Sequence, residues 1–298
     1  MSETTRTKRL LPEPLRRTLR AVRPWQPWRP PLNGPVSRLK AGVARLLVGG
    51  PGWSTEWALR KRLGWGGGAF PPPRRPAHRW VNTTLKSQAQ VDEAMVEVRA
   101  CGLPPNGDLP KNWDALTALS LVLERTRPTA RVLDAGAPLY SVILPWLYMY
   151  GYRDLWGIDL GYRRPVRWGP IRFERGDLTR TRFANGSFDA VTCLSVIEHG
   201  VPFEGYFAEM RRLLRPDGLL VTSTDYWAEG VDTRGQEAFG VPIKIFSRPD
   251  MEAFLASGRA HGFTPLGAVD LECAERVVRW EPYGLAYTFL TFGMTRAA

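Results

Sequence analysis

The sequence predicts an α/β fold with a doubly wound sheet whose parallel strands alternate with helices. Three observations predict it: short apolar strands, acidic or polar residues at their ends, and helical stretches between them. The first strand, Val132 and Leu133, runs into Asp134 and Gly136, and a second strand ends at Asp159, 25 residues after Asp134. In a doubly wound sheet the first turn receives the ligand. We therefore expect a binding edge at Asp134.

The later strands end in polar motifs in the same way. The third ends in Gly176-Asp177-Leu178, and the fourth runs through Ser195 into Glu198-His199. A turn at residues 215–218 precedes the fifth. The predicted strands after the second are 171–175, a fourth that residues 185–191 open and that runs to Ser195, and then 219–224, 264–269 and 285–292.

Three helices are marked by their boundaries. Residues 91–100 and 113–125 precede the first strand, and Asn112 is expected to cap the second of these helices. Ser247 and Asp250 form a capping-box pattern, with Pro249 in the first turn, for a helix that ends near His261.

These ordered motifs together resemble class I S-adenosylmethionine-dependent methyltransferases of the small-molecule group often called type 11. The resemblance extends from about Lys111 to the C-terminus. It implies a Rossmann-like seven-stranded class I methyltransferase sheet flanked by helices, and S-adenosyl-L-methionine as cofactor.

The chain divides into three predicted parts. Residues 1–80 form a basic, Pro/Trp-rich extension, residues 81–128 are helices that cover the cofactor site, and residues 129–298 are the methyltransferase domain. The extension has 17 Lys/Arg, three Asp/Glu, 12 prolines and six tryptophans, whereas the rest of the chain has a net charge of −2. Proline interrupts regular structure, so we expect the extension to be partly disordered.

One stretch of the extension has helical periodicity. Val36, Leu39, Val43 and Leu47 fall at helical spacing with basic residues between them. Such a helix fits an anionic membrane surface or a protein partner, and a solvated tail is the alternative.

Cysteine usage and apolar runs suggest a cytoplasmic protein, membrane-peripheral if the basic helix binds lipid. Cys101, Cys193 and Cys273 are far apart, which predicts neither a disulfide framework nor a zinc site. The run 142–150 is too short to span a bilayer, and the N-terminus lacks a secretory signal pattern.

Asp159 is the expected ribose-binding residue, because a carboxylate accepts both diol hydrogens; a surface Asp at a strand end is the alternative. By resemblance Asp134 orders the glycine loop, and Gly136 lets the backbone approach the cofactor. The family has two further glycines where this chain has Pro138 and Tyr140. Proline fixes φ and has no N–H, so we expect an altered loop path or looser binding.

The remaining cofactor residues are also assigned by resemblance. Asp177 and Leu178 are expected to hold the adenine, with Leu160 beside Asp159, and Ser195 is expected near the transferred methyl. Lys111 is expected to reach the methionine carboxylate and Trp113 to wall the pocket. A simple helix start with a buried Trp is the competing interpretation of Lys111 and Trp113.

His199 is the preferred general base, because its ordinary pKa suits proton abstraction near neutrality. A cap or packing role for Glu198-His199 is the alternative, and Asp225 is the second candidate base. Some relatives hold a divalent metal near such a Glu-His pair, but two residues do not define a site, so no metal is predicted.

The leading interpretation is O-methylation of a small-molecule acceptor, such as a sugar or another secondary metabolite. The alternative is a catalytically inactive methyltransferase-fold scaffold that docks through its basic arm. Binding of nucleic acid depends on positive charge, and the catalytic region is near neutral. We therefore consider a small molecule the better candidate substrate. The sequence does not predict the oligomeric state.

Overall fold

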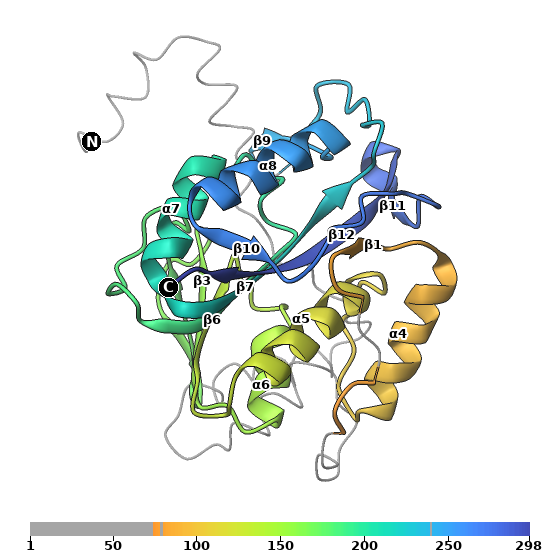
Figure 1. Ribbon diagram of the computed structural model, residues 1–298. Helices are drawn as coiled ribbons and strands as arrows, with labels where there is room; N and C mark the ends of the chain where they lie inside the picture. The colour runs from red at the N-terminus through yellow and green to blue at the C-terminus, as the bar shows by residue number, and fades with distance from the viewer. Residues whose placement is uncertain (1–73, 78–79, 239) are drawn as a thin grey trace, which may run out of the picture.

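The computed structural model describes residues 74–77, 80–238 and 240–298 (Figure 1). The expected helix within residues 36–47 and most of the extension lie outside these residues. The centre of the fold is a set of mutually parallel strands. In spatial order they are β5 (Ile171–Arg175), β3 (Asp154–Asp159), β2 (Arg131–Ala135), β6 (Phe188–Leu194) and β7 (Leu214–Tyr226).

Two further strands complete the predicted set of seven. β12 (Leu285–Arg296) runs antiparallel to β7, and β10 (Phe263–Pro265) pairs antiparallel with β12. Shorter strands extend this sheet or form a small hairpin. They are β1 (Thr83–Thr84), β4 (Val166–Trp168), β11 (Val278–Trp280), and the hairpin β8 (Glu237–Ala238) and β9 (Val241–Pro242). The α/β class and the seven-stranded plan are thereby confirmed.

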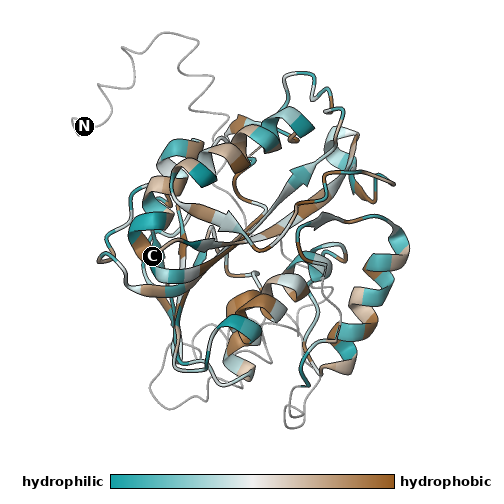
Figure 2. Ribbon diagram, in the orientation of Figure 1, coloured by the Kyte–Doolittle hydropathy of each residue, from teal (hydrophilic) through white to brown (hydrophobic). Residues whose placement is uncertain are grey.

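Helices cover both faces of the sheet (Figure 1). α4 (Gln88–Ala100), α5 (Lys111–Arg125) and α6 (Ile143–Met149) lie on one face, and α7 (Phe203–Leu213) and α8 (Arg248–Ala260) on the other. Each face has its own apolar core. Every residue of α5 from Asn112 to Leu123 is buried. Figure 2 shows brown, apolar ribbon on α6 and teal, polar turns on the outer helix α8.

Local expectations were met in part. Ser247 and Asp250 do form a capping box at α8, with Pro249 in its first turn. Asn112, however, is not a cap: the N-cap of α5 is Pro110, and the Asn112 side chain donates to the carbonyl oxygens of residues 106, 108 and 109. Asn112 therefore closes the preceding loop from inside the first turn.

The ends of two strands also differ from expectation. The turn at residues 215–218 lies inside β7 as an irregularity in its pairing with β6, where Asp217 has φ 60°. The strand expected at 264–269 stops at Pro265. The segment that follows keeps single backbone hydrogen bonds, from the Leu266 amide to Gly293 and from the Asp270 amide to Asn82, and is otherwise held by side chains.

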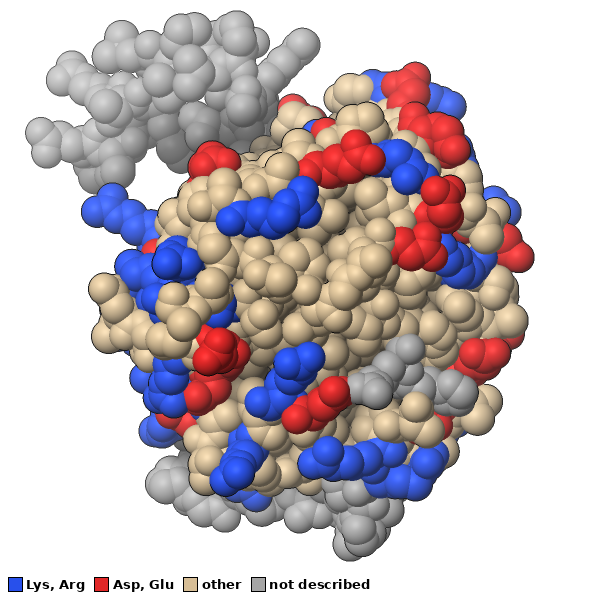
Figure 3. All heavy atoms as spheres, in the orientation of Figure 1, with Lys and Arg blue, Asp and Glu red and all other residues tan. Residues whose placement is uncertain are grey.

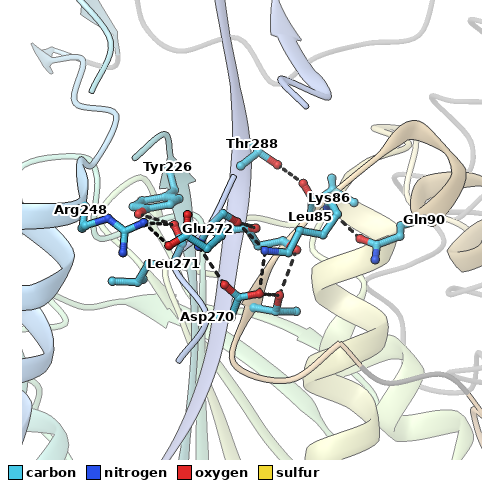
Figure 4. Close-up of polar contacts among 11 residues, drawn as sticks. Leu85, Lys86, Gln90, Tyr226, Arg248, Asp270, Leu271, Glu272 and Thr288 are labelled. Carbon is cyan, nitrogen blue, oxygen red and sulfur yellow. Dashed lines mark hydrogen bonds and ion pairs between the residues drawn. The ribbon is translucent and has the colours of Figure 1, made fainter. Parts of the chain in front are cut away.

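We call these side-chain contacts the clasp (Figure 4). Lys86 forms an ion pair with Asp270 at 2.7 Å and donates to the Glu272 carbonyl oxygen. Arg248 pairs with the Glu272 carboxylate at 2.7 Å, and the Tyr226 hydroxyl donates to the Leu271 carbonyl oxygen at 2.9 Å. The clasp joins the start of the described chain, the end of β7 and α8.

Candidate active site

Asp134 lies at the end of β2 and is only 3% exposed. One carboxylate oxygen accepts from the Thr192 hydroxyl and the other from the Ser141 hydroxyl, both at 2.8 Å. Burial raises the pKa of Asp134 to about 6, although these two hydrogen bonds act to lower it. Asp134 therefore ties β2 to β6 and to the loop that follows β2.

Gly136 leaves no room for a side chain. Its φ is +84°, and a Cβ there would lie 2.4 Å from Cγ2 of Val196. The amides of Gly136 and Ala137 both donate to the Ile158 carbonyl oxygen at 2.8 Å. The loop backbone thus packs against the segment that follows β6.

The loop with Pro138 and Tyr140 is ordered by its own contacts. The Ser141 amide donates to the Pro138 carbonyl oxygen at 2.9 Å, and the Tyr162 hydroxyl donates to the Ala137 carbonyl oxygen at 2.6 Å. The Tyr140 side chain is 57% exposed, where the family pattern has a glycine. Tyr140 therefore presents a large side chain to solvent at this position.

Leu160 and Asp177 line one pocket at the ends of β3 and β5. Its volume is about 370 Å³, and Ile158, Gly176 and Arg180 are among its other walls. Leu160 is 65% exposed. This pocket brings together two residues assigned to the adenosine end of a cofactor.

The carboxylates of Asp159 and Asp177, at the same edge of the sheet, accept hydrogen bonds from residues two positions further along the chain. Asp159 accepts from the Gly161 amide at 2.6 Å, and Asp177 accepts from the amide and hydroxyl of Thr179 at 2.8 and 2.7 Å. Leu178 beside Asp177 is half-buried. After burial, the charges of Asp114 and Asp159 also raise the pKa of Asp134.

A buried ionisable cluster lies where the start of α5 meets the ends of β6, β7 and β12. The Ser223 hydroxyl donates to Asp114 at 2.6 Å, which fixes α5 to β7. The Lys111 ammonium lies 4.5 Å from the centre of the Phe289 ring on β12. The cluster comprises Lys111, Asp114, Glu198, His199, Asp225 and Tyr287.

Glu198 and Asp225 are two buried carboxyl groups of the cluster. They are 2% and 5% exposed, and the Thr224 hydroxyl donates to Glu198 at 3.1 Å. The charge of Glu198 is one of the causes that raise the pKa of Asp225. Two carboxyl groups buried near each other cannot both carry a full charge easily.

Burial and neighbouring charges shift the pKa of these groups. Burial, with Glu198 next in size, raises the pKa of Asp225 to about 8, and burial raises that of Glu198 to about 6. Burial lowers the pKa of His199, so its imidazole is neutral near pH 7. Burial also acts to lower the pKa of Lys111, but the surrounding carboxylates, led by Asp114, raise it overall.

Ser195 and Trp113 both have buried polar atoms without a hydrogen-bond partner within the described part of the chain. Ser195 has φ 51°, a conformation that side chains other than glycine rarely adopt, and its amide donates to Ser223. Trp113 is fully buried, with its ring centre 6.0 Å from that of Trp80. Trp113 therefore lies in the core, as the competing interpretation had it.

The structure gathers Lys111, His199 and Asp225 from three regions of the sequence into one cluster. Sequence reasoning missed the closeness of Glu198 to Asp225 and the roles of Asp114 and Tyr287. Glu198 and Asp225 lie at or after the ends of neighbouring parallel strands, and such ends meet at one edge of a sheet. Their closeness could therefore have been predicted from the sequence. Tyr287 could not be predicted, because its place depends on the antiparallel register of β12.

Two absences concern only the residues that the structure describes. Among them, no group of three or more His, Cys, Asp or Glu side chains is arranged to hold a metal ion. No helix in the same part of the chain is long and apolar enough to cross a membrane.

Known proteins resemble the central part of the chain. Residues 138–222 match the family model described as a methyltransferase domain. A demethylmenaquinone methyltransferase of Beutenbergia cavernae is 34% identical over 104 residues, which are 34% of this chain and 40% of that protein. One of Deinococcus radiodurans is 31% identical over 132 residues, 42% of this chain and 52% of that protein. The matches thus span about half, or less, of each relative.

One solved structure shows a looser likeness. The S-adenosylmethionine-dependent methyltransferase from Mesorhizobium loti is 19% identical, with a TM-score of 0.45, over 61% of this chain and 98% of that one. The fold assignment rests on the strand order, not on this likeness.

Proposed function

We propose, from the premise that this chain contains a class I methyltransferase domain, that it transfers a methyl group from S-adenosylmethionine to a hydroxyl oxygen of a small molecule. A sugar or another secondary metabolite is the proposed acceptor. The observation that carries the proposal is the buried cluster of Lys111, Glu198, His199 and Asp225 at the ends of β6, β7 and α5.

Three features of the described residues fit the cofactor. Gly136 turns the chain after β2 with φ +84°, a left-handed conformation that favours glycine. The 370 Å³ pocket contains Leu160 and Asp177 in the places proposed for adenosine. The Ser195 hydroxyl, directly after β6, is buried and has no hydrogen-bond partner within the described residues. When bound, S-adenosylmethionine supplies a methyl group on a positively charged sulfur.

The chain's own residues then have distinct proposed roles. Asp159 accepts from the ribose hydroxyls, Asp177 and Leu178 hold the adenine, and Lys111 pairs with the cofactor carboxylate. His199, neutral at pH 7, accepts the proton of the hydroxyl acceptor. Alignment of acceptor and methyl group supplies much of the remaining acceleration.

Calorimetry with S-adenosylmethionine and S-adenosylhomocysteine tests the first step. We expect both to bind the full chain. A methyl-transfer assay with sugars, phenols and demethylmenaquinone then tests the acceptor class; the last is included because two relatives are named for it. Transfer only to amines or carbon would contradict the O-methyl proposal.

The inactive scaffold is the second candidate, and the loop of Pro138 and Tyr140 favours it. In the scaffold the basic arm docks and the cluster near His199 is only structural. Absence of cofactor binding at millimolar concentration would select this candidate over the enzyme.

A further inference from the structure

We propose that one corner of the folded domain is a docking surface for an anionic lipid membrane. The corner consists of five exposed arginines, which we call the arginine corner: Arg163, Arg164, Arg167, Arg175 and Arg180. The proposal goes beyond methyl transfer and does not depend on it. It gives the domain a membrane contact of its own, separate from the basic extension.

The near-neutral charge of the domain conceals an uneven distribution. Residues 160–183 contain seven arginines and only two acidic residues. Two of these arginines are neutralised, because Arg172 pairs with Asp154 at 2.9 Å and Arg182 pairs with Glu174. The five arginines of the corner are exposed and have no ion pair within the described part of the chain. Their charge is therefore available to a partner.

The strand order brings the five arginines together. β4 lies beyond β5 at the edge of the sheet, so the chain that leaves β3 crosses the carboxyl end of β5 to reach β4. Arg163 and Arg164 lie in this crossing segment, and Arg167 lies on β4. Arg175 is the last residue of β5, and Arg180 lines the same pocket as Arg175. The five arginines therefore belong to one outer corner of the sheet.

A lipid surface fits this corner better than a nucleic acid does. Like charges without acidic partners repel one another, and a polyanion relieves this repulsion. Single-stranded nucleic acids also stack their bases on exposed aromatic rings, but the rings here are buried or half-buried: Trp168, Phe173, Phe183 and Tyr162. Leu160, which starts the crossing segment, is 65% exposed. Basic side chains beside an exposed apolar one are typical of surfaces that lie on anionic membranes.

The arginine corner and the extension would act together. Residues 1–73, with 14 basic and three acidic residues, supply the first attraction to the surface. Five arginine contacts are of the same order as the cost of immobilising a free domain, so the corner binds weakly by itself. Once the extension is bound, the contact of the corner becomes intramolecular and adds to the affinity. The corner then determines that the β4–β5 edge of the domain faces the membrane.

Flotation of the full chain with lipid vesicles tests the proposal. The probe is vesicles rich in phosphatidylglycerol, and vesicles of phosphatidylcholine alone measure the uncharged background. Arg163→Gln, Arg164→Gln and Arg167→Gln together should weaken binding to the anionic vesicles by about 10–100-fold. The three side chains are exposed, so the unfolding temperature should stay unchanged.

A matched variant removes the same charge elsewhere. Arg125, Arg127 and Arg259 are exposed arginines on other parts of the domain, also without an ion pair among the residues that the structure describes. Arg125→Gln, Arg127→Gln and Arg259→Gln together should weaken vesicle binding by no more than about threefold, because salt screens distant charges. Equal weakening by the two triple variants would mean that only net charge matters, and the proposal would be wrong.

Two further measurements complete the test. Arg163→Lys, Arg164→Lys and Arg167→Lys together keep the charge, so this variant should bind anionic vesicles nearly as well as the natural chain. Its failure to do so would contradict an electrostatic contact. A labelled RNA, single-stranded or duplex, is the competing probe, and we expect the two Gln variants to bind it equally. If the corner variant loses more affinity for RNA than for vesicles, the corner belongs to a nucleic acid and the membrane proposal is overturned.

Discussion

At the scale of single residues, Asp159 is the sharpest test of the cofactor site. Asp159→Ala should weaken S-adenosylmethionine binding by about 1–3 kcal/mol, because a charged hydrogen bond to the ribose is lost. Calorimetry measures the change, with Asp232→Asn in an exposed loop as control. Unchanged affinity would remove Asp159 from the site.

His199 governs turnover rather than binding in the proposed mechanism. His199→Ala should lower turnover by about 10²–10⁴-fold, the usual effect of a positioned base, with cofactor affinity nearly unchanged. The pH–rate profile should also lose its acidic limb. A variant with most of its activity intact would transfer the role to Asp225.

The raised pKa of Asp225 predicts a stability effect of definite sign. A carboxyl whose pKa rises from 3.8 to about 8 on folding stabilises the protein fully below about pH 4, and this contribution is lost as pH rises to 8. Asp225→Asn should therefore become more stable relative to wild type between pH 5 and 8, by about 1–3 kcal/mol. Urea unfolding at the two pH values measures the difference; a constant difference would contradict the raised pKa.

At the scale of elements, the turn after β2 depends on Gly136. Gly136→Ala adds strain at φ +84° and a contact of 2.4 Å with Val196, so the free energy of unfolding should fall by about 2–4 kcal/mol. Gly186→Ala has a similar φ of +58° but open space, so only about 1 kcal/mol is expected. Val196→Ala in the Gly136→Ala background should restore part of the loss. Equal destabilisation by the two glycine variants would mean that Val196 moves away from the new Cβ without an energetic cost.

The elements show what the sequence could predict. β5 and the end of β3 at Asp159 were predicted to the residue, because buried parallel strands are short apolar runs that end in polar residues. β7 begins five residues before the predicted 219–224, since the predicted turn lies inside it. The short strands β1, β4 and β11 carry no such run, since they exist only by pairing with β12 or β5. His199 and Asp225 lie at or after the ends of central strands, so they could be predicted from the sequence. Tyr287 could not, because its position depends on how β12 pairs with β7.

At the scale of the whole molecule, charge is divided between the extension and the rest. On the face seen in Figure 3, side chains of both signs surround a broad uncharged area. Residues 1–73 contain 14 basic and three acidic residues. Binding to anionic vesicles should therefore depend on the extension and weaken with salt.

A chain that begins at Arg74 tests this. The cut falls there because Arg74 and the Ala77 amide bind Glu97 on α4 and Trp80 packs on Trp113. Vesicle co-sedimentation should show binding by the full chain at low salt and little by the shortened chain, with cofactor affinity largely equal. Equal sedimentation of the two would exclude the extension as the membrane contact.

The pairing of β7 with β12 has a consequence for the order in which this chain acquires its structure during synthesis. Thr83 binds Asp270 across 187 positions, and β1 pairs with β12 near the end of the chain. A ribosome releases β7 well before β12 emerges, so the edge of β7 that β12 later covers stays open meanwhile. Such distant pairings form slowly, and an open strand edge invites pairing with other chains. The nascent protein therefore needs protection at that edge until β12 has left the ribosome.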